Sequence, residues 1–396
     1  MVNIMEKNSF GWPLINDNIT DGDKQSLIEF ISIPDVRFTQ HEKVRQFEKE
    51  WSEWLGVKNT TFVNSGASAN WVMASALKEL VGVGEVIMSP FGWVSDIVPF
   101  LELGFTPVFI DVDPFTMSID ENKLIKAINT DTKAVLVTHI LGFNALTDKM
   151  LAAVNRHDLI LIEDCCESHG ATHNGKKIGT FGHMSNFSFY FGHHMTTIEG
   201  GTVCTNDDKI HDIVRMLRSH GMTREASPET RERYVKEYPY LNPLFTFAVP
   251  GYNVRSTELN AVIGINQLKR LDTSISIRKR NLAIWLSHLD QDKFQVKFAT
   301  KGSSNFSLPL ILKNKDADLL SGVKKCLNDN NVEFRLGTAG GGNQSKQPYL
   351  EKFVGKYTPS KTPVLDHIHA FGLYVGNHTE LSGKQIIDLC KNLNNL

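Results

Sequence analysis

The sequence predicts an α/β protein in which a parallel sheet is covered by helices on both faces, with a smaller α+β lobe at the C-terminal end. Over the first two thirds of the chain, short apolar runs rich in β-branched residues alternate with amphipathic helical segments. The runs are apolar on both faces, which is typical of strands buried between two helix layers. With 396 residues, of which 41% are hydrophobic, the chain can bury a large core.

Helical spacing of apolar residues predicts two helices in the segments QSLIEFI and VRQFEKEWSEWLG. Five strands are then expected, centred on Phe62, Ile87, Phe109 and Leu136, or ending at Asp164. A further strand is expected to begin near Ser188 and to bring the chain to His193. A long helical segment containing ELNAVIGINQLKRL leads to the smaller lobe. We expect an N-terminal segment (1–24), a large domain (25–270) and a small C-terminal domain (271–396).

Composition argues against several classes of protein. A formal charge of −2 provides no basic field for nucleic acid. The N-terminus lacks the pattern of a signal peptide and no apolar run reaches the length of a membrane span, so we expect a cytoplasmic protein without a membrane partner. The five cysteines are scattered and form no CxxC pair, which predicts neither a disulfide framework nor a metal site.

The residues that follow the strands are the candidates for function, because ligands bind at the carboxyl ends of parallel strands. The helix start NSGASAN follows the first strand and suits either a phosphate group or ordinary capping. Trp93 follows the second strand, as a cover for a flat ring or as a core aromatic. Asp164 ends a fully apolar strand and therefore needs a cation or hydrogen-bond donors, which a structural salt bridge would also supply.

The stretch SFYFGHHMTTIEGG, from Ser188 to Gly201, carries two adjacent histidines, His193 and His194. Adjacent residues rarely point the same way and no third ligand lies at a suitable spacing, so we do not expect a metal. No lysine occurs between Lys177 and Lys209.

These motifs, in this order, resemble the DegT/DnrJ/EryC1/StrS sugar aminotransferases, which use pyridoxal phosphate (PLP). The similarity runs from LIEFIS and FEKEWSEWLGV through GYNVRSTELNAVIG into the small lobe. It implies the fold-type I, aspartate aminotransferase-like architecture, with a three-layer α/β/α large domain and a smaller α+β C-terminal domain. SFYFGHHMTTIEGG is most similar to the branch of GDP-4-keto-6-deoxy-mannose 3-dehydratases, in which a histidine replaces the Schiff-base lysine.

The resemblance implies roles for the cofactor site. It places Gly66, Ala67, Ser68 and Ser188 around the PLP phosphate, Trp93 on the ring face, Asp164 at the ring nitrogen and Glu167, where most relatives have Gln, near the ring hydroxyl. Asn253, in PGYNVRS, would reach the phosphate of a partner subunit, so a homodimer is implied.

The resemblance also implies residues for the substrates. His220 and Arg224, in RSHGMTRE, match positions near the nucleotide sugar, and Arg255 is a candidate for the carboxylate of L-glutamate. The alternative interpretation of His220 and Arg224 is that they are only charged surface residues after a helix. Phe334, Arg335 and the glycines 340–342 are expected to border the sugar site, although triple glycine is also typical of a flexible loop.

An imidazole forms no stable Schiff base but moves protons near neutral pH. We therefore expect His193 to be the catalytic base and PLP to be held non-covalently. His194 is the rival for the base, and we expect it to have a supporting or structural role. L-glutamate would convert PLP to pyridoxamine phosphate (PMP), and the C3 hydroxyl of a nucleotide-linked 4-keto-6-deoxy sugar would then be lost. The products would be the 4-keto-3,6-dideoxy sugar, 2-oxoglutarate and ammonia, for deoxysugar biosynthesis of the colitose or O-antigen type.

GDP-4-keto-6-deoxy-D-mannose is the expected substrate, with CDP- and dTDP-sugars left open. A catalytically silent relative that binds PLP or a nucleotide sugar is the alternative from another class. The related iron–sulfur dehydrases need clustered cysteines, but Cys204, Cys326 and Cys390 lie far apart, so no iron–sulfur reductase is expected as a partner.

Overall fold

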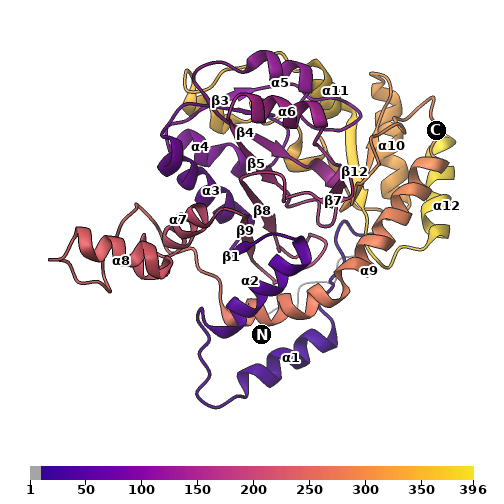
Figure 1. The fold of residues 1–396 in the computed structure, drawn as a ribbon. Helices are drawn as coiled ribbons and strands as arrows, with labels where there is room; N and C mark the ends of the chain where they lie inside the picture. Colours follow the sequence, from indigo (N-terminus) through magenta and orange to yellow (C-terminus); the bar gives the residue numbers. More distant parts are fainter. Residues whose placement is uncertain (1–9) are drawn as a thin grey trace.

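A seven-stranded sheet lies at the centre of the computed structural model, which describes residues 10–396 (Figure 1). Its strands are β1 (Asn59–Val63), β2 (Glu85–Met88), β3 (Thr106–Phe109), β4 (Thr132–Thr138), β5 (Ile160–Asp164), β8 (Met184–Ser188) and β9 (Gly201–Thr205). The order is β1-β9-β8-β5-β4-β2-β3, and β9 alone runs in the direction opposite to the other six strands. The predicted parallel sheet is therefore present with one reversed strand.

Helices cover both faces of this sheet. The helices of the described chain are α1 (Asp21–Ile31), α2 (Glu42–Leu55), α3 (Gly66–Val81), α4 (Val98–Glu102), α5 (Glu121–Ala127), α6 (Asp148–Arg156), α7 (Asp208–Arg218), α8 (Pro228–Glu237), α9 (Glu258–His288), α10 (Ala317–Asp329), α11 (Pro363–Phe371) and α12 (Gly383–Asn394). Of these, α10, α11 and α12 belong to the apolar cluster of the C-terminal part, and α8 has no buried residue. Alternate strand residues face opposite layers. Phe62 and Val135 pack with α2, α5, α6 and the first half of α9, whereas Val63 and Leu136 pack with α3, α4 and α7.

The chain after Ser188 differs from the strand that the sequence predicts. β8 ends at Ser188, and residues 189–200 form a loop that returns to β9. The loop is closed at its base, where the Phe189 amide donates to the Gly200 carbonyl (2.9 Å) and the Thr197 amide donates to the Phe189 carbonyl (2.9 Å). The loop contains no helix, and β9 pairs antiparallel with β8 through Ser185↔Cys204 to Ser188↔Gly201.

The C-terminal part of the chain forms a second, antiparallel sheet in the order β10-β12-β11. Its strands are β10 (Ser307–Ile311), β11 (Phe334–Leu336) and β12 (Gly372–Gly376), and a separate hairpin joins β6 (Thr172–His173) to β7 (Lys176–Lys177). α10 and α12 pack with this sheet and the second half of α9 in one apolar cluster. The proposed boundary at residues 270/271 falls inside α9, and the division into domains stays a prediction.

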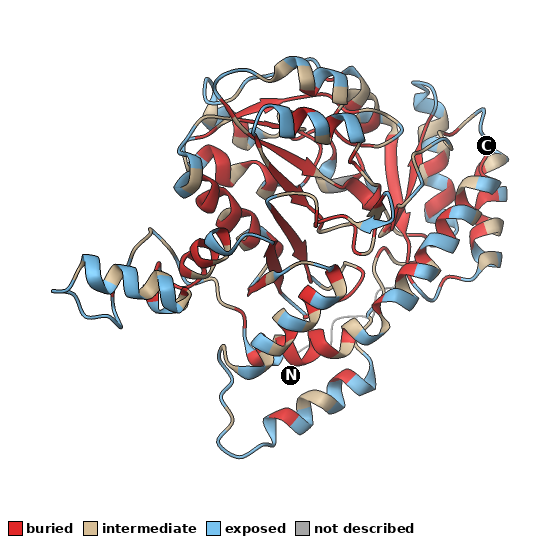
Figure 2. Ribbon diagram, in the orientation of Figure 1, coloured by how far each residue is buried: buried red, intermediate tan, exposed pale blue. Residues whose placement is uncertain are grey.

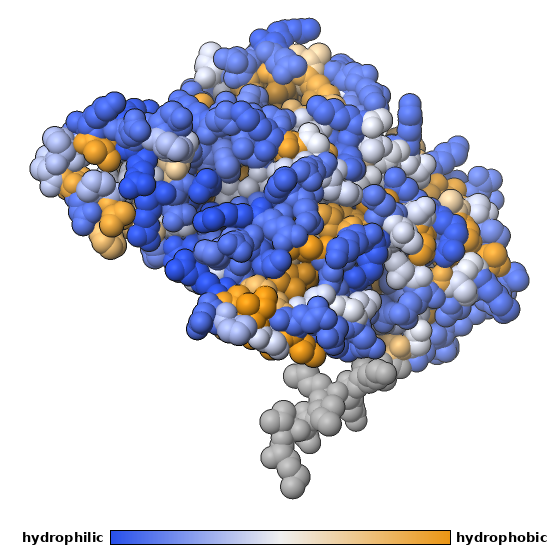
Figure 3. All heavy atoms as spheres, turned by 60° about the horizontal axis from the view of Figure 1, so that its bottom comes forward, coloured by the Kyte–Doolittle hydropathy of each residue, from blue (hydrophilic) through white to orange (hydrophobic). Residues whose placement is uncertain are grey.

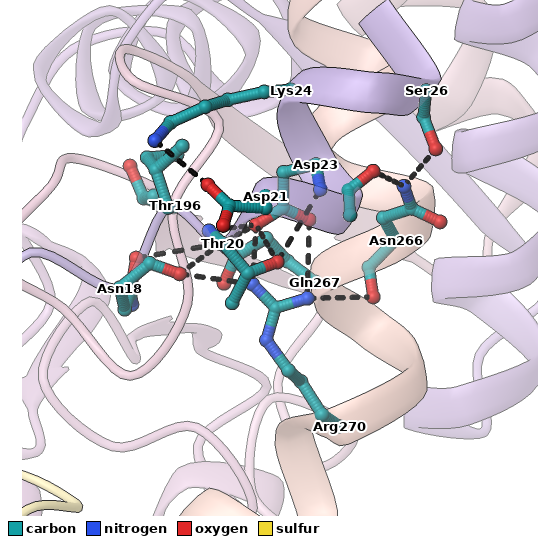
Figure 4. A network of polar contacts seen from close by, with 12 residues as sticks. Asn18, Thr20, Asp21, Asp23, Lys24, Ser26, Thr196, Asn266, Gln267 and Arg270 are labelled. Atoms are coloured by element: carbon teal, nitrogen blue, oxygen red, sulfur yellow. Dashed lines mark hydrogen bonds and ion pairs between the residues drawn. The ribbon is translucent and has the colours of Figure 1, made fainter.

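The N-terminal segment is tied to both parts of the fold. The Trp12 indole donates to the Gly376 carbonyl (2.9 Å) in β12. Farther along, Asp23 in α1 lies between Arg270 and Gln267 of α9, and the Gln267 amide donates to the Asp23 carboxylate (3.1 Å; Figure 4). The segment between these anchors is therefore held across the junction of the two sheets.

α8 projects from the body of the molecule and has no buried residue (Figures 1 and 2). The chain that returns from it exposes large apolar side chains, at Tyr240, Leu244, Phe245, Phe247 and Tyr252. We call residues 228–247 the α8 arm. Within residues 10–396, no helix has the length and hydropathy that a membrane span requires.

Candidate active site

A cavity of about 370 Å³ opens at the edge of the large sheet where β1, β2, β4, β5 and β8 end. The N-terminal segment contributes Leu14 and Ile15 to its wall, and the C-terminal part contributes Phe306, Arg335 and Tyr374. The cavity is thus bounded by both sheets. Seven of the residues predicted for the cofactor and the catalytic base line it, namely Gly66, Ala67, Trp93, Asp164, Glu167, Ser188 and His193. Arg335 and Gly340, which were expected to border the sugar site, line it as well.

The first turn of α3 forms one end of the cavity. The Ser65 hydroxyl caps this helix by accepting from the Ser68 amide (3.0 Å), and it also donates to the Ser68 hydroxyl (3.0 Å), so Ser68 lies beside the cavity rather than in its wall. The amides of Gly66 and Ala67 have no partner within the helix and attract an anion. A Cβ on Gly66 would lie 2.7 Å from the Ser188 Cβ, so only glycine lets the helix start approach β8 this closely.

Asp164 lies at the floor of the cavity and is almost fully buried. Its Oδ2 accepts from the side-chain amides of Asn70 (2.9 Å) and Asn186 (3.1 Å), and its Oδ1 accepts from the Cys166 amide (2.9 Å). These donors hold the carboxylate in one orientation but carry no charge. A cation placed in the cavity would therefore meet a fixed anion.

The residue before Asp164 in β5, Glu163, supports this arrangement without lining the cavity. Buried Glu163 accepts from the amides of Gly179 (2.8 Å), Phe181 (2.9 Å) and Gly182 (2.7 Å), and it contacts the His139 ring (3.3 Å). His139, Glu163 and Cys165 are close enough to hold a metal ion, but these contacts already use both carboxylate oxygens. We assign the group a structural role that anchors β5.

Glu167 follows one turn later, and its carboxyl accepts from the Leu141 amide (2.6 Å). Burial, only partly offset by that hydrogen bond, raises the pKa of Glu167 to about 8, with a further contribution from the charge of Asp164. In the protein without ligand this side chain is therefore a neutral carboxylic acid at neutral pH, able to donate a hydrogen bond as a glutamine would.

His193 lies on the loop after β8, in a turn in which its amide donates to the Tyr190 carbonyl (3.0 Å). Burial lowers the pKa of His193 to about 4, despite the opposing charge of Asp164. The ring is therefore neutral at neutral pH and can accept a proton. A Cβ on Gly192 would lie 2.9 Å from the Ile15 Cδ1, so the N-terminal segment packs directly on this turn.

His194 points away from the cavity. Its Nε2 donates to the Ser304 carbonyl (3.0 Å), and burial lowers its pKa well below the ordinary value. The two rings thus have different surroundings, which favours His193 as the residue that meets a ligand.

The remaining predicted residues lie outside this cavity, on one surface of the same chain. His220 and Asn253 are exposed and neighbouring, because the His220 amide donates to the Tyr252 carbonyl (2.8 Å) and Ser219 pairs with Asn253. Arg224 and Arg255 line a second pocket of about 540 Å³. No residue of this group reaches the cavity of its own chain.

Arginines dominate the second pocket. Its lining residues include Arg37, Arg45, Arg215, Arg218, Arg224 and Arg255, against two acids, Glu48 and Glu225. Arg218 is nearly fully buried and donates to Glu48 (2.6 Å). The excess of positive charge suits an anion. We did not predict Arg37, Arg45, Arg215 and Arg218 from the sequence, and the spacing of Arg215 and Arg218 along one helix is the signal that could have pointed to part of this pocket.

The cavity fits the cofactor that the resemblance implies. Unpaired helix amides lie at one end for a phosphate, Trp93 lies beside them with 55% of its surface free to cover a ring, and Asp164 offers a fixed carboxylate. The buried His193 Nδ1 has no hydrogen-bond partner within the described chain. No lysine is among the lining residues that the structure describes.

Comparisons with known proteins point the same way. The model of the DegT/DnrJ/EryC1/StrS aminotransferase family matches residues 24–394. The chain is 34% identical over 365 residues to GDP-4-keto-6-deoxy-D-mannose 3-dehydratase of Yersinia pseudotuberculosis, covering 91% of each protein.

Two solved structures agree in fold over nearly the whole chain. One is the Escherichia coli GDP-4-keto-6-deoxy-D-mannose-3-dehydratase with bound hydrated PLP, with a TM-score of 0.87, 31% identity and coverage of 97% of this chain and 99% of that one. The other is a GDP-4-keto-6-deoxymannose-3-dehydratase with a trapped PLP–glutamate geminal diamine, with a TM-score of 0.86, 30% identity and coverage of 96% and 100%. The predicted fold-type I architecture is confirmed.

Proposed function

The chain belongs to the DegT/DnrJ/EryC1/StrS aminotransferase family, and from this we propose that it is a PLP-dependent dehydratase. It removes the C3 hydroxyl of a nucleotide-linked 4-keto-6-deoxy sugar, with GDP-4-keto-6-deoxy-D-mannose as the substrate and L-glutamate as the amino donor. The products are the 4-keto-3,6-dideoxy sugar, 2-oxoglutarate and ammonia. We place this reaction in the cytoplasm, and cell fractionation tests the location.

The observation that carries the proposal is a neutral imidazole, His193, in the cavity wall that also holds Asp164 and Glu167. A lysine at this place would bind the cofactor covalently and deliver an amino group to the sugar. His193 instead accepts a proton at a ring nitrogen and donates it to the C3 oxygen as the hydroxyl leaves. The outcome is loss of the hydroxyl rather than transfer of nitrogen.

The cofactor, as PLP or PMP, supplies an electron sink when its ring nitrogen is protonated. The chain's own residues hold it without a covalent bond. The amides of Gly66 and Ala67 and the Ser188 hydroxyl bind the phosphate, Trp93 covers the ring and Asp164 keeps the ring nitrogen protonated. Glu167, as a neutral acid, donates to the ring hydroxyl.

The active form is a homodimer in which Asn253 of one chain completes the cavity of its partner. This proposal rests on the exposure of Asn253 and on its absence from the lining of its own cavity. Apolar side chains gather at the tip of the α8 arm, which suits burial against a second copy (Figure 3). In the dimer the arginine pocket, with Arg224 and Arg255, would receive the diphosphate of the nucleotide sugar or the carboxylate of glutamate.

Activity tests the proposed reaction directly. The purified protein is incubated with PLP, L-glutamate and a panel of GDP-, CDP- and dTDP-linked 4-keto-6-deoxy sugars, without added reductase. We expect a product one oxygen atom lighter than the GDP-sugar, with ammonia in equal amount. Formation of an amino sugar would refute the dehydratase assignment, and failure of glutamate to bleach the PLP absorbance would refute the amino-donor step.

Hybrid dimers test the contribution of Asn253. Co-expression of His193→Asn and Asn253→Ala chains yields dimers in which one cavity carries both defects and the other carries neither. If Asn253 acts on its partner's cavity, two weakly active parents form hybrids with about half the wild-type activity per dimer. Hybrids as weak as their parents would show that Asn253 acts within its own chain.

A further inference from the structure

A second buried carboxylate lies beside Asp164. Asp96 ends a short 3-10 turn after β2, is 3% exposed and lines the same cavity. One side-chain amide bridges the two acids, because the Asn70 Nδ2 donates to the Asp96 Oδ1 (3.1 Å) and to the Asp164 Oδ2 (2.9 Å). The Thr138 hydroxyl donates to the other oxygen of Asp96 (2.9 Å).

The backbone makes room for this carboxylate. A Cβ on Gly92 would lie 2.4 Å from the Asp96 Oδ2 and 3.6 Å from the Thr138 Oγ1. Any side chain at position 92 would therefore push Asp96 out of its place beside Asp164. The position of the Asp96 carboxylate therefore requires a glycine at position 92.

The pair has no compensating cation within the described chain, because its donors are the neutral groups of Asn70, Asn186, Thr138 and the Cys166 amide. Two carboxylates that close in a buried site cannot both be ionised at low cost. In agreement, burial and then the charge of Asp164 raise the pKa of Asp96 well above its usual range.

The other titratable groups that face Asp96 do not relieve this repulsion. They are Glu167, the Cys166 thiol and the Tyr349 hydroxyl, none of which can become a cation. Burial raises the pKa of Cys166 and of Tyr349, so both are neutral at neutral pH.

We propose that Asp96 and Asp164 form a carboxylic acid–carboxylate pair that holds one proton beside the ring nitrogen of the cofactor, with Asp96 as a positioning residue. The identity of the ligand as PLP or PMP rests on the proposed function. The role of Asp96 at the cofactor ring goes beyond that function. The shared proton lies on Asp96, which leaves Asp164 ionised to meet the ring N–H. When Asp96 loses its proton at higher pH, a second negative charge faces the cofactor ring. This charge raises the pKa of the ring nitrogen.

The first experiment needs neither cofactor nor substrate. Infrared spectra of the cofactor-free protein, with and without isotope-labelled aspartate, distinguish a protonated aspartate from the neighbouring Glu167. We expect a protonated aspartate carboxyl band at neutral pH that is lost in Asp96→Asn and kept in Glu167→Gln. Absence of the band from the wild-type protein would overturn the proposal, whether or not the variant folds and whatever reaction the enzyme catalyses.

The second experiment reads the effect on the ring. PLP labelled with ¹⁵N at the ring nitrogen is bound to the wild-type protein and to Asp96→Asn, in which the side chain keeps its shape but cannot become charged. We expect the ring nitrogen to lose its proton at a pH at least about one unit lower in the variant, a tenfold loss of proton affinity. Identical titrations of the two proteins would overturn the proposal.

Discussion

Replacing Glu167 by glutamine removes an ionisable group while keeping an oxygen that accepts from the Leu141 amide. The folded protein holds the Glu167 proton up to a pKa of about 8, whereas the unfolded chain releases it near the ordinary value of 4.5. Between these values the folded state binds more protons. The stabilisation from this group is therefore complete below about pH 4.5 and is lost as the pH rises towards 8.

The size of the effect follows from the same shift. One pH unit within this window changes the free energy of unfolding by at most about 1.4 kcal/mol. Because the carboxyl lines a cavity that admits water, we expect roughly half of that slope, or about 2 kcal/mol between pH 5 and pH 8. The stability of Glu167→Gln relative to the wild-type protein should rise by this amount over the interval.

Urea unfolding of the cofactor-free protein at several pH values measures the difference. Glu53→Gln, which removes an exposed glutamate from α2, controls for the loss of one negative charge. A difference between Glu167→Gln and the wild-type protein that does not change with pH would refute the assignment of Glu167 as a neutral acid.

Three further predictions concern the cavity and its cover. His193→Lys should lose dehydration and gain a PLP adduct that borohydride traps, as mass spectrometry of the intact protein would detect; an adduct-free, fully active variant would contradict the role of His193. Gly92→Ala should lower the free energy of unfolding by about 1–3 kcal/mol, because the new Cβ displaces the Asp96 carboxylate. It should also weaken PLP binding in a fluorescence titration, and an unchanged affinity for PLP would contradict the described packing. Arg270→Ala should release the segment before α1, because Asp23 loses its charged partner. Limited proteolysis should then cleave that segment faster than in the control Lys24→Ala, in which only an exposed ion pair is lost. Equal cleavage rates in the two variants would contradict the anchoring role of Arg270.

The strands β1 to β5 of the large sheet could be predicted from the sequence, because each is a short apolar run that packs on both faces. The strand expected after Ser188 was wrong for a related reason. Phe189 is as apolar and buried as a strand residue, but it fills the core from the loop that leads from β8 to its antiparallel partner β9. Apolar pattern alone cannot distinguish these two cases.

The candidate site was predictable where its residues follow strands in recognisable motifs, as Asp164 and His193 do. Asp96 was not, because its contact with Asp164 joins two strand ends that are 68 positions apart in the chain. The arginine pocket was missed for the same reason, since Arg37, Arg45 and Arg215 come from separate elements that meet only in the fold.

The central claim is that an imidazole in place of the lysine directs the bound cofactor towards loss of the C3 hydroxyl. Mass spectrometry of the sugar formed by the wild-type protein from GDP-4-keto-6-deoxy-D-mannose, PLP and ¹⁵N-labelled glutamate tests it most directly. We predict a sugar that has lost one oxygen atom and carries no ¹⁵N, with the label recovered as ammonia. A sugar that keeps its oxygen and carries ¹⁵N would contradict the account.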